Sequence, residues 1–179
     1  MRADIDATVT YPHPVERVWA ALTSSDALAA WLMPNDFAPQ VGRAFTFTTT
    51  PAPGFDGIVR CEVLELDPPT RMVWSWAGGL GLQTTVTFTL TAERAADGAE
   101  RTRLRMHQVG FHGLSGQLVR RILAGGWPRI LGELLPRYLA EAEGTGSGPV
   151  RVSCPAGGRS YLGILRRWRG DAPAADRIR

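Results

Sequence analysis

Histidine and cysteine side chains are the first candidates for chemistry in this chain, and their spacing limits what that chemistry can be. The histidines, His13, His107 and His112, are far apart, and none stands in a metal-binding spacing such as His-Glu-x-x-His. The cysteines, Cys61 and Cys154, form no metal or redox pair, and a reducing cytoplasm would keep them as thiols. We therefore predict neither a metal site nor a cofactor.

Nucleophiles and acid–base groups are equally scarce at useful spacings. The sequence has no Gly-x-Ser-x-Gly elbow and no glycine-rich phosphate loop, and all twenty basic residues are arginine, which excludes a Schiff-base lysine. Asp4 and Asp6 point outward by strand parity. His107, at the end of the last predicted strand where a cavity would open, and Tyr138, with its hydroxyl inside, remain as candidates for proton transfer. We interpret His107 first as a structural or rim histidine, so the sequence favours a protein that is not an enzyme.

These side chains must be positioned by a sheet and its covering helices. Alternation of apolar and polar residues over 5–11 predicts a strand, and two short helical stripes follow it, near 15–23 and 24–32. Further strand-like segments are joined by tight turns, and an amphipathic helix follows from Trp127 to Leu139. We predict an α+β fold in which the C-terminal helix covers the apolar face of a six-stranded antiparallel sheet. The later strands are expected near 44–50, 58–67, 72–76, 82–91 and 101–106, with a bulge where the parity changes between Val63 and Leu64.

Large apolar side chains on the inward positions form the candidate wall of a cavity. Each could simply be core, but four indoles that face one space between sheet and helix are hard to pack without leaving a void. We interpret Trp31 as a gate at the mouth of this cavity. The candidate ligand-binding residues are Trp31, Phe45, Phe47, Met72, Trp74, Trp76, Phe88, Leu104, Met106, Trp127, Leu131, Leu134 and Tyr138.

Composition and charge divide the chain into a domain, residues 1–142, and a tail, residues 143–179. The domain holds thirteen arginines against fourteen acidic residues, a near neutrality that argues against nucleic-acid binding. The tail holds seven arginines against three acidic residues and is rich in Gly and Pro, which predicts a flexible extension. Its apolar residues near Trp168 could instead make a weak contact with a protein or a membrane surface. Without a membrane-spanning run or a signal peptide, we expect a cytoplasmic protein with no stable membrane insertion.

Several segments together resemble a known family. They are PVERVWAALTSSDALAAWL, VLELDPPTRMVWSW, TVTFTL, TRLRMHQVGF and GGWPRILGELLPRYL, and over residues 4–142 they resemble the AHSA1-like (activator of Hsp90 ATPase homologue) branch of the START/Bet v 1 (SRPBCC) superfamily. The resemblance implies a helix-grip fold, in which a curved antiparallel sheet wraps round the long C-terminal helix and leaves a hydrophobic cavity. Two features of the sequence concern that helix. Pro136 should kink it, and Gly125 with Gly126 should separate residues 114–124 as a short helix or lid.

Three functions follow from this resemblance and from the aromatic wall. The first is binding of a small hydrophobic or aromatic ligand in the cavity, by a monomer or a homodimer. The second is a cyclase- or aromatase-like enzyme that uses the same cavity, with His107 or Tyr138 as acid or base. The third is a co-chaperone of Hsp90, which we expect least, because no segment here corresponds to the additional N-terminal domain of the eukaryotic activators.

Overall fold

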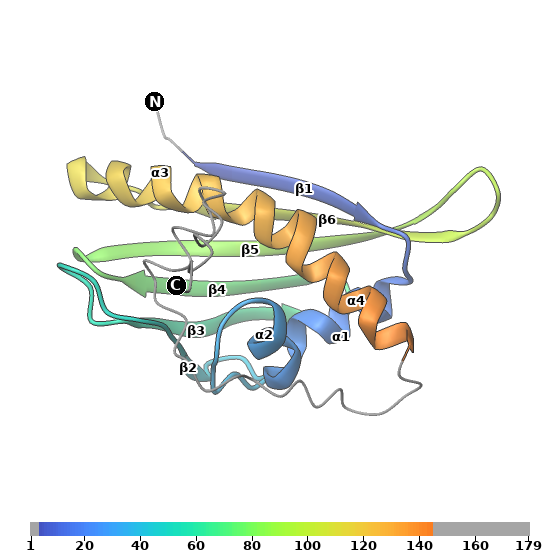
Figure 1. Cartoon of the computed structure of the whole chain (residues 1–179), viewed down its shortest axis with the longest axis horizontal. Coiled ribbons are helices and arrows are strands. Elements are labelled where there is room, and N and C mark those ends of the chain that lie inside the picture. The colour runs from blue at the N-terminus through green and yellow to red at the C-terminus, as the bar shows by residue number, and fades with distance from the viewer. Residues whose placement is uncertain (1–3, 145–179) are drawn as a thin grey trace, which may run out of the picture.

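The computed structural model describes residues 4–144 of the 179-residue chain, and the predicted tail therefore lies outside the described residues. A strand, two short helices, five more strands and a long helix follow one another, as the sequence predicts (Figure 1). The strands are β1 (Ile5–Tyr11), β2 (Ala44–Thr48), β3 (Ile58–Asp67), β4 (Arg71–Gly78), β5 (Leu82–Arg94) and β6 (Glu100–Val109). The helices are α1 (Val15–Thr23), α2 (Ser25–Trp31), α3 (Gly113–Arg129), the π-helical turn η1 (Ile130–Leu134) and α4 (Leu135–Gly144).

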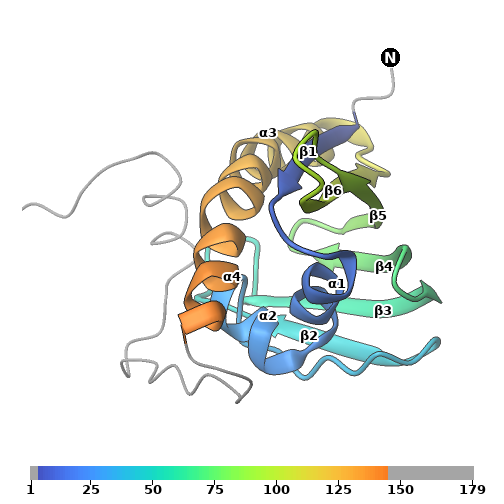
Figure 2. The ribbon, with the colours of Figure 1, turned by 90° about the vertical axis from the view of Figure 1, so that its right-hand side faces the viewer.

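The six strands form one sheet in the order β1-β6-β5-β4-β3-β2, and every neighbouring pair is antiparallel. Alternation fixes which face is buried: along β5, Val86, Phe88 and Leu90 are buried between more exposed threonines. The register shifts between Val63 and Glu65 of β3, which confirms the predicted bulge. The sheet curves round the C-terminal helix, and α1 and α2 close the side near β2 and β3 (Figure 2). The α+β helix-grip architecture is thus confirmed.

Local sequence explains the two short helices. Pro14 precedes α1, where its fixed φ suits the start of a helix, and the carbonyl of Pro14 accepts the first helical hydrogen bonds. Ser24 ends α1 and caps α2, because its Oγ accepts a hydrogen bond from the backbone N–H of Ala27 at 3.3 Å. Trp31 is buried, and its Nε1 donates to the Ala21 carbonyl at 2.9 Å. Trp31 therefore holds α1 and α2 together, and its interpretation as a gate stays a prediction.

The C-terminal helix continues through the glycines that the sequence predicts to break it. Gly125 and Gly126 lie within α3, which begins at Gly113, so residues 114–124 are the first half of one helix and not a separate one. Each glycine costs roughly 1 kcal/mol relative to alanine, but burial of the neighbouring Leu123 and Trp127 stabilises the helix by more than that. Tertiary packing overrides local propensity here.

In the part of the chain that the structure describes, no helix has the length and apolarity needed to cross a bilayer.

Pro136, the second residue of α4, is accommodated by the π-helical turn η1, which directly precedes that helix. Within η1 the backbone N–H of Leu135 donates to the carbonyl of Ile130, five residues earlier. In the same pattern the Leu131 carbonyl would accept from residue 136, but proline has no N–H. The hydroxyl of Tyr11 takes that place and donates to the Leu131 carbonyl at 2.7 Å. The proline thus creates the acceptor that ties the helix to β1.

Candidate functional site

The interior between the sheet and the C-terminal helix is lined by the side chains that the sequence predicts. Eleven of them are at most 5% exposed, whereas Leu134 and Tyr138 are partly buried at the margin. The eleven are Trp31, Phe45, Phe47, Met72, Trp74, Trp76, Phe88, Leu104, Met106, Trp127 and Leu131. Burial is what a core and a closed ligand site have in common, so the polar atoms among these side chains decide between the two.

Trp74 of β4 lies at the centre of an aromatic cluster. The centroid of its ring system lies 4.9 Å from that of Phe88, 5.4 Å from Phe45, 5.6 Å from Phe37 and 5.9 Å from Phe47. The pairs with Phe88 and Phe45 are edge-to-face, the geometry that aromatic quadrupoles favour. Three of these phenyl rings belong to the sheet, and Phe37 comes from the connection between α2 and β2.

The indole Nε1 of Trp74 is buried and has no hydrogen-bond partner within the part of the chain that the structure describes. Other indoles of the interior are satisfied: Trp31 donates to a backbone carbonyl, and Trp127 donates to the Gln108 side chain at 2.8 Å. A buried donor without an acceptor costs roughly 1–3 kcal/mol. Trp74 therefore offers a hydrogen bond that the described protein does not use.

A short chain of polar groups crosses the interior beside this cluster. Gln108 of β6, fully buried, accepts from Trp127 and donates through Nε2 to the Thr84 Oγ1 at 2.9 Å. Thr84 in turn donates to the Trp76 carbonyl at 3.1 Å. Every polar atom of these side chains thus has a partner, which makes the chain a fixed link between β4, β5, β6 and α3.

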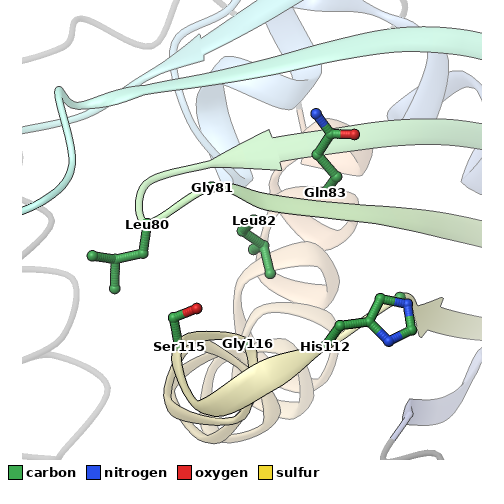
Figure 3. Close-up of a pocket in the computed structure, with 8 residues that line it drawn as sticks. Leu80, Gly81, Leu82, Gln83, His112, Ser115 and Gly116 are labelled. Atoms are coloured by element: carbon green, nitrogen blue, oxygen red, sulfur yellow. The ribbon is translucent and has the colours of Figure 1, made fainter.

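A pocket of about 200 Å³ opens at one end of the molecule, between the β4–β5 turn and the start of α3 (Figure 3). Leu80 and Ser115 lie on opposite sides of it, and the side chain of His112 lies on its rim (Figure 3). Gly110 allows the chain to turn here, because its φ is +105° and an added Cβ would lie 3.0 Å from the Gln83 carbonyl oxygen. This pocket is separate from the aromatic cluster and was not predicted.

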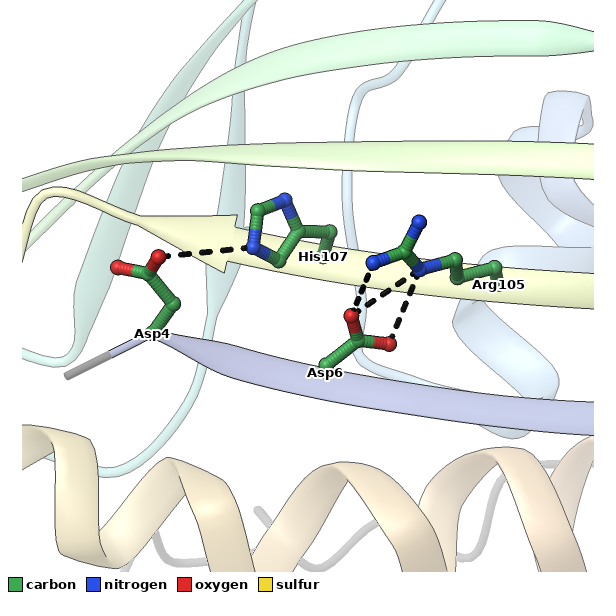
Figure 4. A network of polar contacts seen from close by, with 4 residues as sticks. All are labelled: Asp4, Asp6, Arg105 and His107. Carbon is green, nitrogen blue, oxygen red and sulfur yellow. Dashed lines mark hydrogen bonds and ion pairs between the residues drawn. The ribbon is translucent and has the colours of Figure 1, made fainter. Parts of the chain in front are cut away.

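His107 lies on the outer face of the sheet, not at the rim of the interior. Its neighbours Met106 and Gln108 point inward, so strand parity sends His107 the other way. There its Nε2 is 3.7 Å from a carboxylate oxygen of Asp4, the residue just before β1 (Figure 4). Next to this pair, Asp6 accepts hydrogen bonds from Arg105, and the guanidinium holds the pKa of that carboxyl below its usual range (Figure 4). The outward direction predicted for Asp4 and Asp6 is confirmed, but His107 cannot reach a molecule held in the interior.

Tyrosine and cysteine side chains near the interior are poor nucleophiles or bases. Loss of solvent raises the pKa of Tyr138, and the negative charge of Asp26 on α2 raises it further. Burial also raises the pKa of Tyr11 and of Cys61 far above their ordinary values. Among the described residues, no group of three or more His, Cys, Asp or Glu side chains could hold a metal ion.

Sequence reasoning missed three parts of this interior. Gln108 shares the inward parity of Met106, and continuing the alternation by one step would have found it. The role of Tyr11 depends on a carbonyl 120 residues away, which no local pattern indicates. Phe37 lies in a loop without periodicity, so nothing in the sequence places it against Trp74.

Comparison with known proteins agrees with this architecture. Residues 12–140 match the family model of "activator of Hsp90 ATPase homolog 1-like protein". The chain is similar to the crystal structure of protein MLL2253 from Mesorhizobium loti, with 31% identity, a TM-score of 0.67, and coverage of 78% of this chain and 98% of that one. It is also similar to DynU16, from the dynemicin biosynthetic locus, at 26% identity and a TM-score of 0.62 over 78% of this chain and 48% of that one.

A third similar structure is the Aha1 dimer from Colwellia psychrerythraea. It is 21% identical, with a TM-score of 0.58 over 82% of this chain and 99% of that one, and it supports the fold alone. No curated protein matches the sequence.

Proposed function

The chain belongs to the AHSA1-like family, and from this premise we propose that it binds a small hydrophobic or aromatic ligand between the sheet and the C-terminal helix. The observation that carries the proposal is the unpartnered Nε1 of Trp74 in the middle of an aromatic cluster. A purely structural core would gain stability from an apolar residue of similar shape at this position. The ligand that fits is an aromatic molecule with an exposed acceptor oxygen, such as a ketone or a phenol.

An ordered water is a weaker match for this donor. A buried water needs two to four polar partners. Here it would find one donor, the Trp74 Nε1, because the phenyl rings round Trp74 have no polar atoms. An organic acceptor brings its own apolar body, so it satisfies the indole and the rings together. The donor thus selects for a ligand that combines both properties.

Phe37 marks the route by which such a ligand would reach Trp74. Of the four rings packed on Trp74, only that of Phe37 comes from a loop, and its backbone N–H is held by the Asn35 side chain at 3.1 Å. A planar ligand that replaced the Phe37 ring would meet the faces and edges of Phe45 and Trp74 without disturbing the sheet. We place the opening at this loop, on the side of α2.

The test uses two fluorescent naphthalene probes that differ in one acceptor, a dimethylamino naphthyl ketone and the same ring without the ketone. We expect the unmodified protein to bind the ketone more tightly, and Trp74→Phe to weaken ketone binding by about tenfold, since a hydrogen bond in a dry site is worth roughly 1–3 kcal/mol. Binding of the probe without the ketone should change little.

Trp76→Phe is the matched control, because Trp76 is the next inward indole on the same strand and loses the same atoms. Equal effects of the two substitutions on both probes would mean that probe binding depends on the size of the side chain and not on the hydrogen bond from Trp74. Absence of uptake of either probe by the unmodified protein would refute the proposed function. If the Trp74 donor instead points at a phenyl face, Trp74→Phe will leave the preference for the ketone unchanged.

The two alternative functions have less support from the described residues. A cyclase- or aromatase-like reaction needs an acid or base inside, but His107 lies on the outer face of the sheet and Tyr138 is only partly buried at the margin of the core. A co-chaperone role is suggested by the family description alone. Stimulation of the ATPase of a cognate Hsp90 would support that role, and unchanged ATPase activity would remove it.

A further inference from the structure

An exposed apolar surface lies at the end of the molecule where α3 begins. Leu114 is 93% exposed and Leu118 is 56% exposed, and they are one turn apart on the face of α3 that points away from the sheet. Leu80, 49% exposed, lies in the adjacent β4–β5 turn across the pocket from Ser115 (Figure 3). Three of the five large hydrophobic side chains that are exposed in the described chain thus meet at one end, and we call them the leucine patch.

The charge around the leucine patch has one sign. Between His107 and Gly132, the stretch that ends β6 and forms α3, the sequence holds three arginines and two histidines and no aspartate or glutamate. Helix α3 itself carries Arg120, Arg121 and Arg129, of which Arg129 is paired with Glu133. In the described part of the chain, Arg120 bonds only the neutral Gln117 side chain, and Arg121 is exposed and forms no salt bridge.

Carboxylates on the neighbouring elements do not compensate these charges. Asp4, just before β1, faces His107, and Asp56 on the β2–β3 connection is bound to Arg60 at 2.8 Å. The two arginines of α3 therefore keep their full attraction for an external anion.

We propose that the leucine patch, with Arg120 and Arg121, docks the protein on an anionic membrane surface. Exposed leucines can enter the boundary between headgroups and acyl chains, while arginines one or two turns along the helix reach the lipid phosphates. The proposal is independent of what, if anything, the interior binds.

Like charge argues against the two other occupants of this surface. A second copy related by two-fold symmetry would bring the same arginines against each other. The chain after residue 144 has seven arginines and two acidic residues, so its net charge also has the same sign. An anionic lipid surface is complementary in both charge and polarity.

The test is flotation of the full-length chain with vesicles at low salt. We expect binding to vesicles of phosphatidylcholine and phosphatidylglycerol in similar amounts, weak binding to phosphatidylcholine alone, and loss of binding as salt is added. The double variant Arg120→Gln/Arg121→Gln should lower the partition coefficient by about 25-fold, about fivefold for each charge. Leu114→Ser/Leu118→Ser should lower it by about tenfold or more.

The matched control is Val41→Ser/Leu64→Ser, which changes the other two exposed apolar side chains. These lie near each other, where the Gly42 N–H donates to the Val63 carbonyl, and the control should bind vesicles as the unmodified chain does. All substituted positions are exposed except Arg120, which is partly buried and bonds only the neutral Gln117, so urea denaturation should show unchanged stability within about 0.5 kcal/mol.

A second control removes three charges of the tail, Arg166→Gln/Arg167→Gln/Arg169→Gln, in the full-length chain. Loss of vesicle binding in this variant alone, with the leucine-patch variants unaffected, would overturn the proposal. Equal binding to both vesicle types would overturn it as well. So would a sedimentation experiment in which Leu114→Ser/Leu118→Ser converts a dimer to a monomer and vesicle binding is unchanged.

Discussion

The hydrogen bond from Tyr11 to the Leu131 carbonyl gives the sharpest test of how the C-terminal helix is held. Tyr11 is 1% exposed, and its hydroxyl lies 2.7 Å from a carbonyl that Pro136 leaves without a helical partner. Tyr11→Phe keeps the ring and removes the donor, so a buried acceptor loses its partner. We expect the free energy of unfolding to fall by about 2 kcal/mol, within the range of 1–3 kcal/mol for such a loss.

A second substitution separates this cause from a general packing defect. Pro136→Ala returns a backbone N–H that can reach the Leu131 carbonyl or restore a regular helical turn. In that background Tyr11→Phe should cost about 1 kcal/mol less, and urea unfolding of the four proteins in a double-mutant cycle measures the difference. Additive costs within error would refute the link between the proline, the π-helical turn and the tyrosine.

Three further predictions concern pH, the polar chain and helix glycines. Burial raises the pKa of Tyr11 in the folded protein above the ordinary value of 10.0, so the unfolded chain releases this proton at a lower pH than the folded protein does. The free energy of unfolding should therefore be highest below pH 10.0 and fall as the pH rises above 10.0. Tyr11→Phe should make this fall less steep, which urea unfolding between pH 9 and 11, roughly one pH unit on each side, would measure. Gln108→Leu leaves the Trp127 indole without its acceptor and should lower the unfolding free energy by about 2–4 kcal/mol, with a shift in tryptophan emission. Gly125→Ala should raise the unfolding free energy by roughly 0.5–1 kcal/mol, because an added Cβ meets nothing within 4 Å, whereas Gly110→Ala should lower it at a φ of +105°.

The sheet could be predicted from sequence because period-two alternation is a local signal that burial enforces. Leu104 and Met106 alternate with outward arginines on β6, and this parity is the one the structure has. The bulge at Val63 was visible as a change of parity for the same reason. The placement of His107 at the opening of the cavity was wrong because it used the position of the residue along the strand and ignored the parity of its neighbours.

The C-terminal helix shows where local reasoning fails. Glycine propensity predicts a break at Gly125 and Gly126, yet the helix runs through both because Trp127 and Leu123 bury their side chains on the sheet. Pro136 was expected to kink the helix, and the actual adjustment is a π-helical turn before it. Both outcomes depend on what the helix packs against, which the sequence window does not contain.

The two proposals fall on different halves of this one helix, and the sequence explains the division. From Trp127 onward, one face of the helix is buried, and two of its carbonyls accept hydrogen bonds from distant donors, Tyr11 to Leu131 and Arg17 to Leu139, each at 2.7 Å. Before Gly125, the outward face instead carries the exposed Leu114 and Leu118 and, seven residues after Leu114, the exposed Arg121, which forms no salt bridge within the described residues. A helix needed only to close the core would gain nothing from leucine at a 93% exposed position, and polar residues there would keep the protein more soluble. The second half is therefore accounted for by the fold and the interior, whereas the exposed leucines of the first half are the side chains that the proposed membrane docking would use.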